Sequence, residues 1–164
     1  MIPHARFQVL VDDAGLTESS PYMMEVDFHV IKEDWSRFRL DDDTLLKVRL
    51  PVRKIFETIV PQGYPVFSVD TITVITTIAL DSSKREPSKQ PWNPKVDVPE
   101  DIGFTILKEA WQEYRTFDNF KVLVKPVLVK VYKYNRYNIY GEPIYNASVQ
   151  AIINGEKIIR VTGA

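Results

Sequence analysis

The sequence predicts a mainly β protein in which one β unit occurs twice and the two copies form a pseudo-two-fold barrel or sandwich. Three observations predict this: apolar and polar residues alternate over long stretches, a shift of 76 residues superposes the two halves, and a proline-rich stretch separates them. Two alternatives fit the same patterns. One is a pair of small tandem β-barrels, and the other is an α+β fold with a helix near 101–115.

The repeat is clearest around two tryptophans. A shift of 76 residues places Phe28–Arg39 on Phe104–Arg115, and Trp35 then falls on Trp111. The register continues without a gap over 28–56, with 8 identities in 29 positions, whereas unrelated segments of mixed composition share roughly two. We infer an internal duplication.

The duplication predicts one domain, 1–164, made of two units. The first unit is 26–80, preceded by an N-terminal strand at 5–11, and the second unit is 101–164. Between them, 81–100 holds four prolines, which predicts an exposed connector without regular structure. Because a β unit of this size buries only a marginal core alone, the two units are expected to share one core.

Alternating apolar residues predict the individual strands. The predicted strands share a period of two, and they are 26–30, 46–52, 66–80, 122–132 and 144–153. Residues 102–108 also fit the start of a capped helix, but the first unit has no such start at the same place. We therefore expect a strand there.

Two short polar segments predict turns. Asp41-Asp42-Asp43 is expected to form a hairpin turn between two apolar stretches. Asn154-Gly155 is a strong signal for a type I′ hairpin, which would fold the segment after it back on the strand before it.

Composition excludes several classes of protein. The chain has no cysteine, so disulfides, thiolate catalysis and cysteine metal sites are excluded. No apolar run reaches the roughly 18–20 residues that span a bilayer, and the first residues lack a signal-peptide pattern. We therefore expect a soluble, cytoplasmic protein without membrane contacts, and the many prolines are compatible with a thermophilic source.

Neither a catalytic motif nor a metal motif occurs, so the sequence predicts no catalytic residue, metal site or cofactor. Glu25, Asp27 and His29 would share one strand face and could bind a metal. The second unit has Asp101, Gly103 and Thr105 in these places. The row is therefore not a property of the unit, and we interpret it as a solvated outer face.

Lys54 and Lys130 occupy equivalent positions that call for an explanation. Counting in twos from the apolar residues before them places both lysines on the apolar face of a strand. A buried unpaired ammonium is very costly. Either a β-bulge turns the side chains outward, or the two cations face each other across the pseudo-axis as an anion site.

The repeated tryptophans also have two interpretations. Trp35 and Trp111 are either core aromatics at a strand-to-turn junction or a stacking surface for a base or a sugar.

Residues 119–140 form the most basic stretch and contain no acidic residue. Its cations are Lys121, Lys125, Lys130, Lys133 and Arg136, and its tyrosines are Tyr132, Tyr134, Tyr137 and Tyr140. Cations and aromatic rings on strands are typical of single-stranded nucleic-acid binding. The alternative is an ordinary sheet whose lysines guard an edge.

The leading hypothesis is a non-enzymatic β-rich binding or assembly module whose ligand the sequence does not identify. It could form a homo-oligomer through its sheet edges. The first alternative is a single-stranded nucleic-acid-binding protein that uses 119–140. The second alternative is a small enzyme with its site between the two units.

Overall fold

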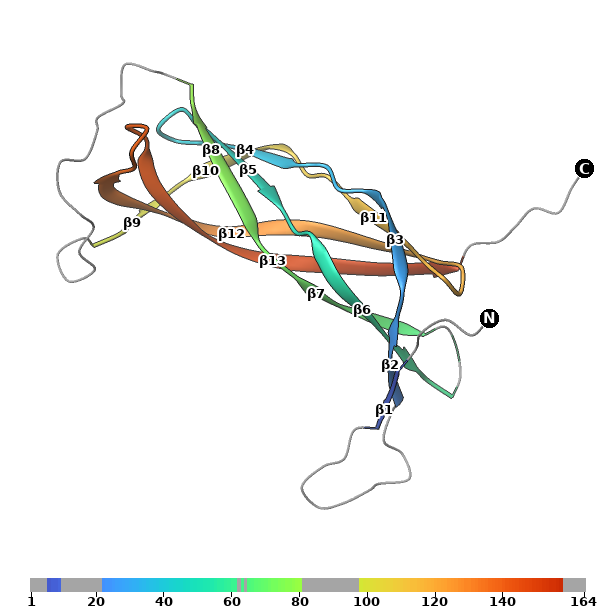
Figure 1. Cartoon of the computed structure of the whole chain (residues 1–164). Coiled ribbons are helices and arrows are strands. Elements are labelled where there is room, and N and C mark those ends of the chain that lie inside the picture. Colours follow the sequence, from blue (N-terminus) through green and yellow to red (C-terminus); the bar gives the residue numbers. More distant parts are fainter. Residues whose placement is uncertain (1–5, 10–21, 62, 64, 81–97, 158–164) are drawn as a thin grey trace, which may run out of the picture.

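The chain is a β protein throughout the part that the structure describes. The computed structural model describes residues 6–9, 22–61, 63, 65–80 and 98–157. These residues form thirteen strands and no helix (Figure 1). The mainly β prediction is confirmed, and the alternative with a helix near 101–115 is wrong. That segment forms three short strands instead, because its backbone pairs in antiparallel register with strands elsewhere in the chain.

The strands before the connector are β1 (Arg6–Val9), β2 (Tyr22–Val26), β3 (Phe28–Lys32), β4 (Ser36–Leu40), β5 (Thr44–Arg49), β6 (Val52–Ile59), β7 (Val66–Thr71) and β8 (Val74–Ala79). Those after it are β9 (Glu100–Ile102), β10 (Phe104–Lys108), β11 (Gln112–Thr116), β12 (Phe120–Tyr137) and β13 (Pro143–Lys157). The predicted N-terminal strand at 5–11 corresponds to β1. Residues 5, 10 and 11 and most of the predicted connector, 81–97, lie outside the described residues.

The strands form three antiparallel sheets, all open. Sheet I has the order β1-β2-β6-β7, sheet II has the order β10-β4-β5-β8, and sheet III has the order β13-β12-β11-β3, with β9 also paired to β12. The predicted barrel, single or tandem, is therefore wrong for the described residues. Closure fails because the chain changes sheet after Arg49: β5 lies in sheet II and β6 in sheet I, with Pro51, which lacks a backbone donor, between them.

Sheets II and III each contain strands from both units. β10 of the second unit pairs with β4, with Phe104 opposite Leu40. β3 of the first unit pairs with β11, with Phe28 opposite Thr116. Each partner in the second pairing is the residue 76 positions away from its counterpart in the first. Both edge strands are also bulged at the same place, at Ile31 and Leu107.

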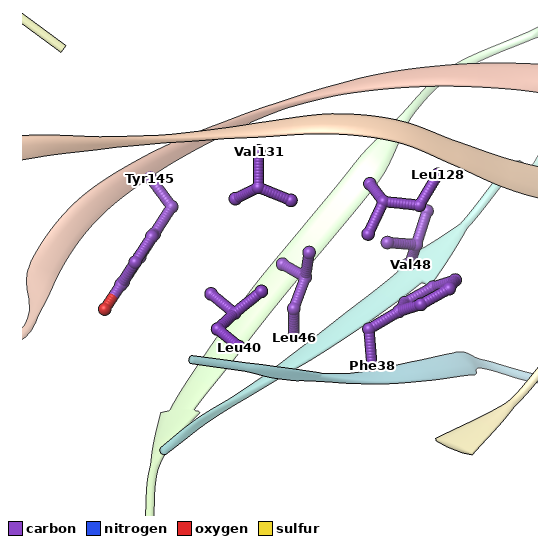
Figure 2. Packing of buried hydrophobic residues seen from close by; sticks show 7 residues of the cluster. All are labelled: Phe38, Leu40, Leu46, Val48, Leu128, Val131 and Tyr145. Carbon is purple, nitrogen blue, oxygen red and sulfur yellow. The ribbon is translucent and has the colours of Figure 1, made fainter. Parts of the chain in front are cut away.

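One core lies between sheets II and III. Figure 2 shows Leu128, Val131 and Tyr145 of β12 and β13 pointing toward the side chains of β4 and β5. The latter are Phe38, Leu40, Leu46 and Val48. Phe104 of β10 extends this core with an edge-to-face contact to Phe38 at 5.8 Å between ring centroids.

A second core lies between sheets I and III at the other end of β12. It combines residues of β6 and β7 and the preceding bend with residues of β11 and the first half of β12, namely Leu50, Val52, Ile55, Phe67, Tyr114, Val122 and Val124. Phe28 meets Tyr114 edge-to-face at 5.7 Å, which matches the contact between Phe104 and Phe38. Each core is therefore built from side chains of both units.

The predicted turn at Asp41-Asp42-Asp43 is confirmed. Asp43 has a φ of 62° and its N–H donates to Leu40 O at 3.0 Å. Asn119, the equivalent residue in the second unit, has a φ of 65° and donates to Thr116 O at 3.1 Å. Asp and Asn tolerate this left-handed conformation better than most side chains.

The predicted hairpin at Asn154-Gly155 is wrong. β13 runs straight through both residues, and Gly155 lies opposite Val122. The glycine has a packing role instead, because a Cβ at this position would lie 2.3 Å from Cδ2 of the Phe67 ring. The sequence signal was misleading because a tight turn and a close ring contact both require glycine.

Gly155→Ala is therefore expected to destabilise the protein by about 1–3 kcal/mol, since the buried Phe67 ring must move. Gly103→Ala is the matched control. The atoms nearest to its Cβ would be those of the carboxylate of the exposed Asp41, which can rotate away. Chemical denaturation of the two variants measures the difference, and equal stabilities would contradict the packing role of Gly155.

Candidate functional site

Lys54 and Lys130 point outward because the strand is bulged just before each of them. The register shifts between Val52 and Lys54 in β6 and between Leu128 and Lys130 in β12. Each ammonium has a carboxylate partner on the neighbouring strand. Lys54 lies 3.7 Å from Glu25, and Lys130 lies 3.0 Å from Asp101, whose hydrogen bond raises the pKa of Lys130. The bulge interpretation is confirmed, and each cation lies beside its own carboxylate.

Acidic residues outside the basic stretch 119–140 pair with its lysines. All four of its lysines form ion pairs: Lys121 with Glu113 at 3.6 Å, Lys125 with Glu109 at 3.7 Å, Lys130 with Asp101 at 3.0 Å, and Lys133 with Asp42 at 2.7 Å. Tyr132 lies against the Lys130 ammonium, 5.3 Å from its ring centroid. Tyr134 and Arg136 also lie on β12 and have interaction partners.

Asp42 is the centre of a polar cluster that joins the two units. Lys133 Nζ and the Tyr145 hydroxyl both donate to Asp42 Oδ2, and the hydroxyls of Tyr145 and Thr44 lie 3.0 Å apart. Burial alone would raise the pKa of Asp42, but the hydrogen bonds from Lys133, Tyr145 and Thr44 outweigh it, so the pKa lies below its usual value. Burial and the Asp42 carboxylate raise the pKa of the Tyr145 hydroxyl.

The equivalent place at the other end of the molecule holds two acids. Glu57 stands where the second unit has Lys133, and Asp118 stands where the first unit has Asp42. The Glu57 side chain is only 5% exposed, and its Oε2 has no hydrogen-bond partner among the described residues. Burial, followed by the hydrogen bond and charge of Asp118, raises the pKa of Glu57 to about 8. Both causes favour the protonated form of Glu57.

The two tryptophans lie under cations and not in either core. The Trp35 ring centroid is 4.8 Å from Lys47 Nζ and 4.6 Å from Arg49 Cζ. The Trp111 ring is 37% exposed and lies 4.9 Å from Lys125 Nζ. Both rings therefore make cation–π contacts on the outer faces of the sheets, which leaves their part in ligand binding a prediction.

The row Glu25, Asp27 and His29 does not converge on a common point. Asp27 Oδ1 accepts the N–H of Phe28 at 2.8 Å, and Glu25 pairs with Lys54. The His29 ring contacts Phe117 at 5.0 Å between centroids. Across the described residues, no group of three or more His, Cys, Asp or Glu side chains could hold a metal ion.

Sequence reasoning missed two features of these sites. The first is the buried Glu57, which an alternation count places on the inner face only after the bulge is known. The second is Gln112, whose side chain bonds to the backbone of Leu50 in the other unit. The available signal was that Gln112 lies two residues before Tyr114 and so on the same strand face; the structure buries both side chains.

Comparison of the chain with protein-family models, curated proteins and solved structures finds no match. In the part of the chain that the structure covers, no helix has the length and apolarity that a bilayer crossing requires.

Proposed function

We propose that the chain is a non-enzymatic binding or assembly module and that it associates with a second copy of itself. The main support is a pair of apolar ridges on β3 and β10. Strand β3 forms one edge of sheet III, and β10 forms one edge of sheet II. The ridge residues are Val30 at 55% exposure, Ile31 at 50%, Ile106 at 53% and Leu107 at 54%. Single exposed apolar residues are ordinary, but adjacent pairs at two equivalent edges form a pattern.

The bulges at Ile31 and Leu107 favour contact through side chains. A bulge interrupts the ladder of backbone donors and acceptors, so a second strand cannot extend the edge in regular register. The apolar side chains remain available. Because the two ridges are alike, a second copy of the chain offers each of them a surface of the same apolar character.

Sedimentation velocity over a range of concentrations tests this proposal. The wild-type chain is expected to associate, and the double variant Val30→Lys, Ile106→Lys is expected to remain monomeric with an unchanged far-UV circular dichroism spectrum. Val129→Lys is the matched control, because Val129 is 49% exposed but lies on β12, away from both edges. A wild-type chain that stays monomeric at every concentration would contradict the proposal.

We further propose that the two units are copies of one ancestral unit, related by a pseudo-two-fold axis within one domain. The matching strand registers, the matching bulges and the left-handed residues Asp43 and Asn119 support this, as do the left-handed glycines Gly63 and Gly141 in the following loops. The exchange of β3 and β10 between the units has the form of a domain-swapped dimer joined into one chain.

Nothing in the geometry favours the two alternatives in their original form. Nucleic-acid binding through 119–140 loses its main support because the four lysines of the stretch have carboxylate partners. An enzyme between the units would need an accessible acid or nucleophile. Glu57 has the raised pKa of a general acid, but it is buried from any substrate.

A further inference from the structure

The outer face of sheet II is basic. The four strands of this sheet, β10, β4, β5 and β8, contain no Asp or Glu in their described sequences. They contain five cations, which are Arg37, Arg39, Lys47, Arg49 and Lys108. We call these five residues the basic face.

Strand alternation places the cations of β4 and β5 on one side of the sheet. Phe38 and Leu46, which are paired across the two strands, are buried in the core, so their neighbours Arg37 and Lys47 project from the opposite side. Arg37 lies opposite Lys47 on β5 and opposite Lys108 on β10. Three cations therefore form a row across three adjacent strands, with about 4.8 Å between neighbouring strands.

Among the described residues, most of the basic face has no carboxylate partner. Arg39 pairs with Asp43 at 2.6 Å. No carboxylate of the described residues forms an ion pair with Arg37, Lys47, Arg49 or Lys108. This contrasts with the lysines of 119–140, which all have carboxylate partners.

Trp35 holds two of these cations in place. Lys47 and Arg49 both lie against its ring, at 4.8 and 4.6 Å from the centroid. The buried Nε of Arg49 has no hydrogen-bond partner in the described part of the chain. Because the ring lies beneath two cations, it supports the basic face and leaves little surface for stacking against a base.

The equivalent face of sheet III differs in charge. Glu113 stands in place of Arg37, and Leu123 stands in place of Lys47. Glu113 neutralises Lys121, and Glu109 neutralises Lys125, the residue equivalent to Arg49. Two faces with the same backbone arrangement therefore differ in charge. The face of sheet III can serve as the control when the basic face is tested for binding.

We propose that the basic face binds nucleic acid through its phosphate backbone, without sequence preference. This inference rests on the proposed function as a binding module and names one partner of that module. A row of unpaired cations matches a chain of phosphates, and guanidinium and ammonium groups are the usual phosphate ligands of proteins. Sequence preference is not expected, because phosphate groups are the same in every nucleotide and contacts to them carry no sequence information.

Fluorescence anisotropy tests the proposal. The full chain is titrated into a labelled oligonucleotide of mixed sequence, which is single-stranded in one arm of the experiment and duplex in the other. At low salt we expect binding that weakens as salt is added. Arg37→Ala with Lys47→Ala is expected to lower the affinity at least about tenfold, and to reduce the slope of log K against log salt by about 1.4 on a single strand. Lys121→Ala with Lys125→Ala removes the same charge from the opposite sheet and should change the affinity by less than about twofold.

Three results would overturn the proposal: no binding at low salt, an equal loss in both double variants, or binding to anionic phosphatidylserine vesicles that exceeds binding to either oligonucleotide. Thermal melting of the variants establishes that both remain folded. Self-association measured by sedimentation is independent of these results. A chain that associates but binds no oligonucleotide would overturn this inference and leave the proposed function standing.

Discussion

The stability of the protein is expected to fall as the pH rises from about 5 to about 9, and Glu57→Gln is expected to abolish most of this loss. Glu57 lies between Met24 and Phe67 on the neighbouring strands and faces Asp118. Its pKa is about 8 in the folded chain, against an ordinary value of 4.5 for a glutamate in water. The contribution of this proton to stability is therefore complete below 4.5 and is lost as the pH rises through about 8.

The expected loss is up to about 3 kcal/mol, because one pKa unit corresponds to about 1.4 kcal/mol and water around the exposed Asp118 screens part of the full shift. Glutamine keeps a donor for Asp118 but does not ionise. Urea denaturation of both chains from pH 5 to pH 9 measures the effect. Asp42 affects stability at acidic pH in the opposite sense. Its pKa is lowered in the folded chain, so its contribution to stability is present above pH 3.8 and is lost only as the pH falls through the lowered pKa. A wild-type chain as stable at pH 9 as at pH 5 would contradict the environment assigned to Glu57.

Gln112→Ala is expected to destabilise the fold by about 2–4 kcal/mol. The Gln112 amide accepts the N–H of Leu50 at 2.8 Å and donates to Leu50 O at 2.6 Å and to the Tyr114 hydroxyl at 2.8 Å. The Tyr114 hydroxyl in turn donates to Glu33 at 2.7 Å. Leu50 lies between β5 and β6, where the chain leaves one sheet for another. The amide therefore supplies the bonds that a neighbouring strand would otherwise make.

Alanine would leave a buried backbone N–H and C=O of Leu50 unpaired, and each unpaired group costs about 1–3 kcal/mol. Gln150→Ala is the control, because Gln150 is an exposed glutamine on β13. Its loss is expected to change the free energy of unfolding by less than about 0.5 kcal/mol. If chemical denaturation finds the two variants equally stable, the bond to Leu50 does not hold the bend.

The sequence predicted individual strands and turns better than the pairing of strands into sheets. Strand periodicity located most strands, and the acidic turn at 41–43 was found because Asp is typical of such turns. The open sheets could not be predicted, because no local pattern shows that β3 pairs with β11 and that β10 pairs with β4. The Asn154-Gly155 prediction was wrong because the residue that needs the glycine, Phe67, lies far away in the sequence.

Contacts between residues far apart in the sequence also decide which charged side chains are paired. The stretch 119–140 is basic in sequence, yet its lysines meet acids that come from other strands and turns, such as Asp42 and Asp101. The cations of the basic face are spread over three strands, and two of those, β4 and β5, belong to the unit that is net negative overall. A count of charged residues along the chain could find the lysines of 119–140 but not the cations of the basic face.

Each core takes side chains from both units, so neither half of the chain is expected to fold alone. Cutting the gene between the codons of Lys89 and Gln90 and producing the two halves separately tests this claim. Each half alone is expected to lack a cooperative thermal transition and the near-UV circular dichroism of buried tyrosine and phenylalanine rings, and mixing the halves is expected to restore both. A half that unfolds cooperatively by itself would contradict the claim that each core needs both units, and with it the proposal of a single domain.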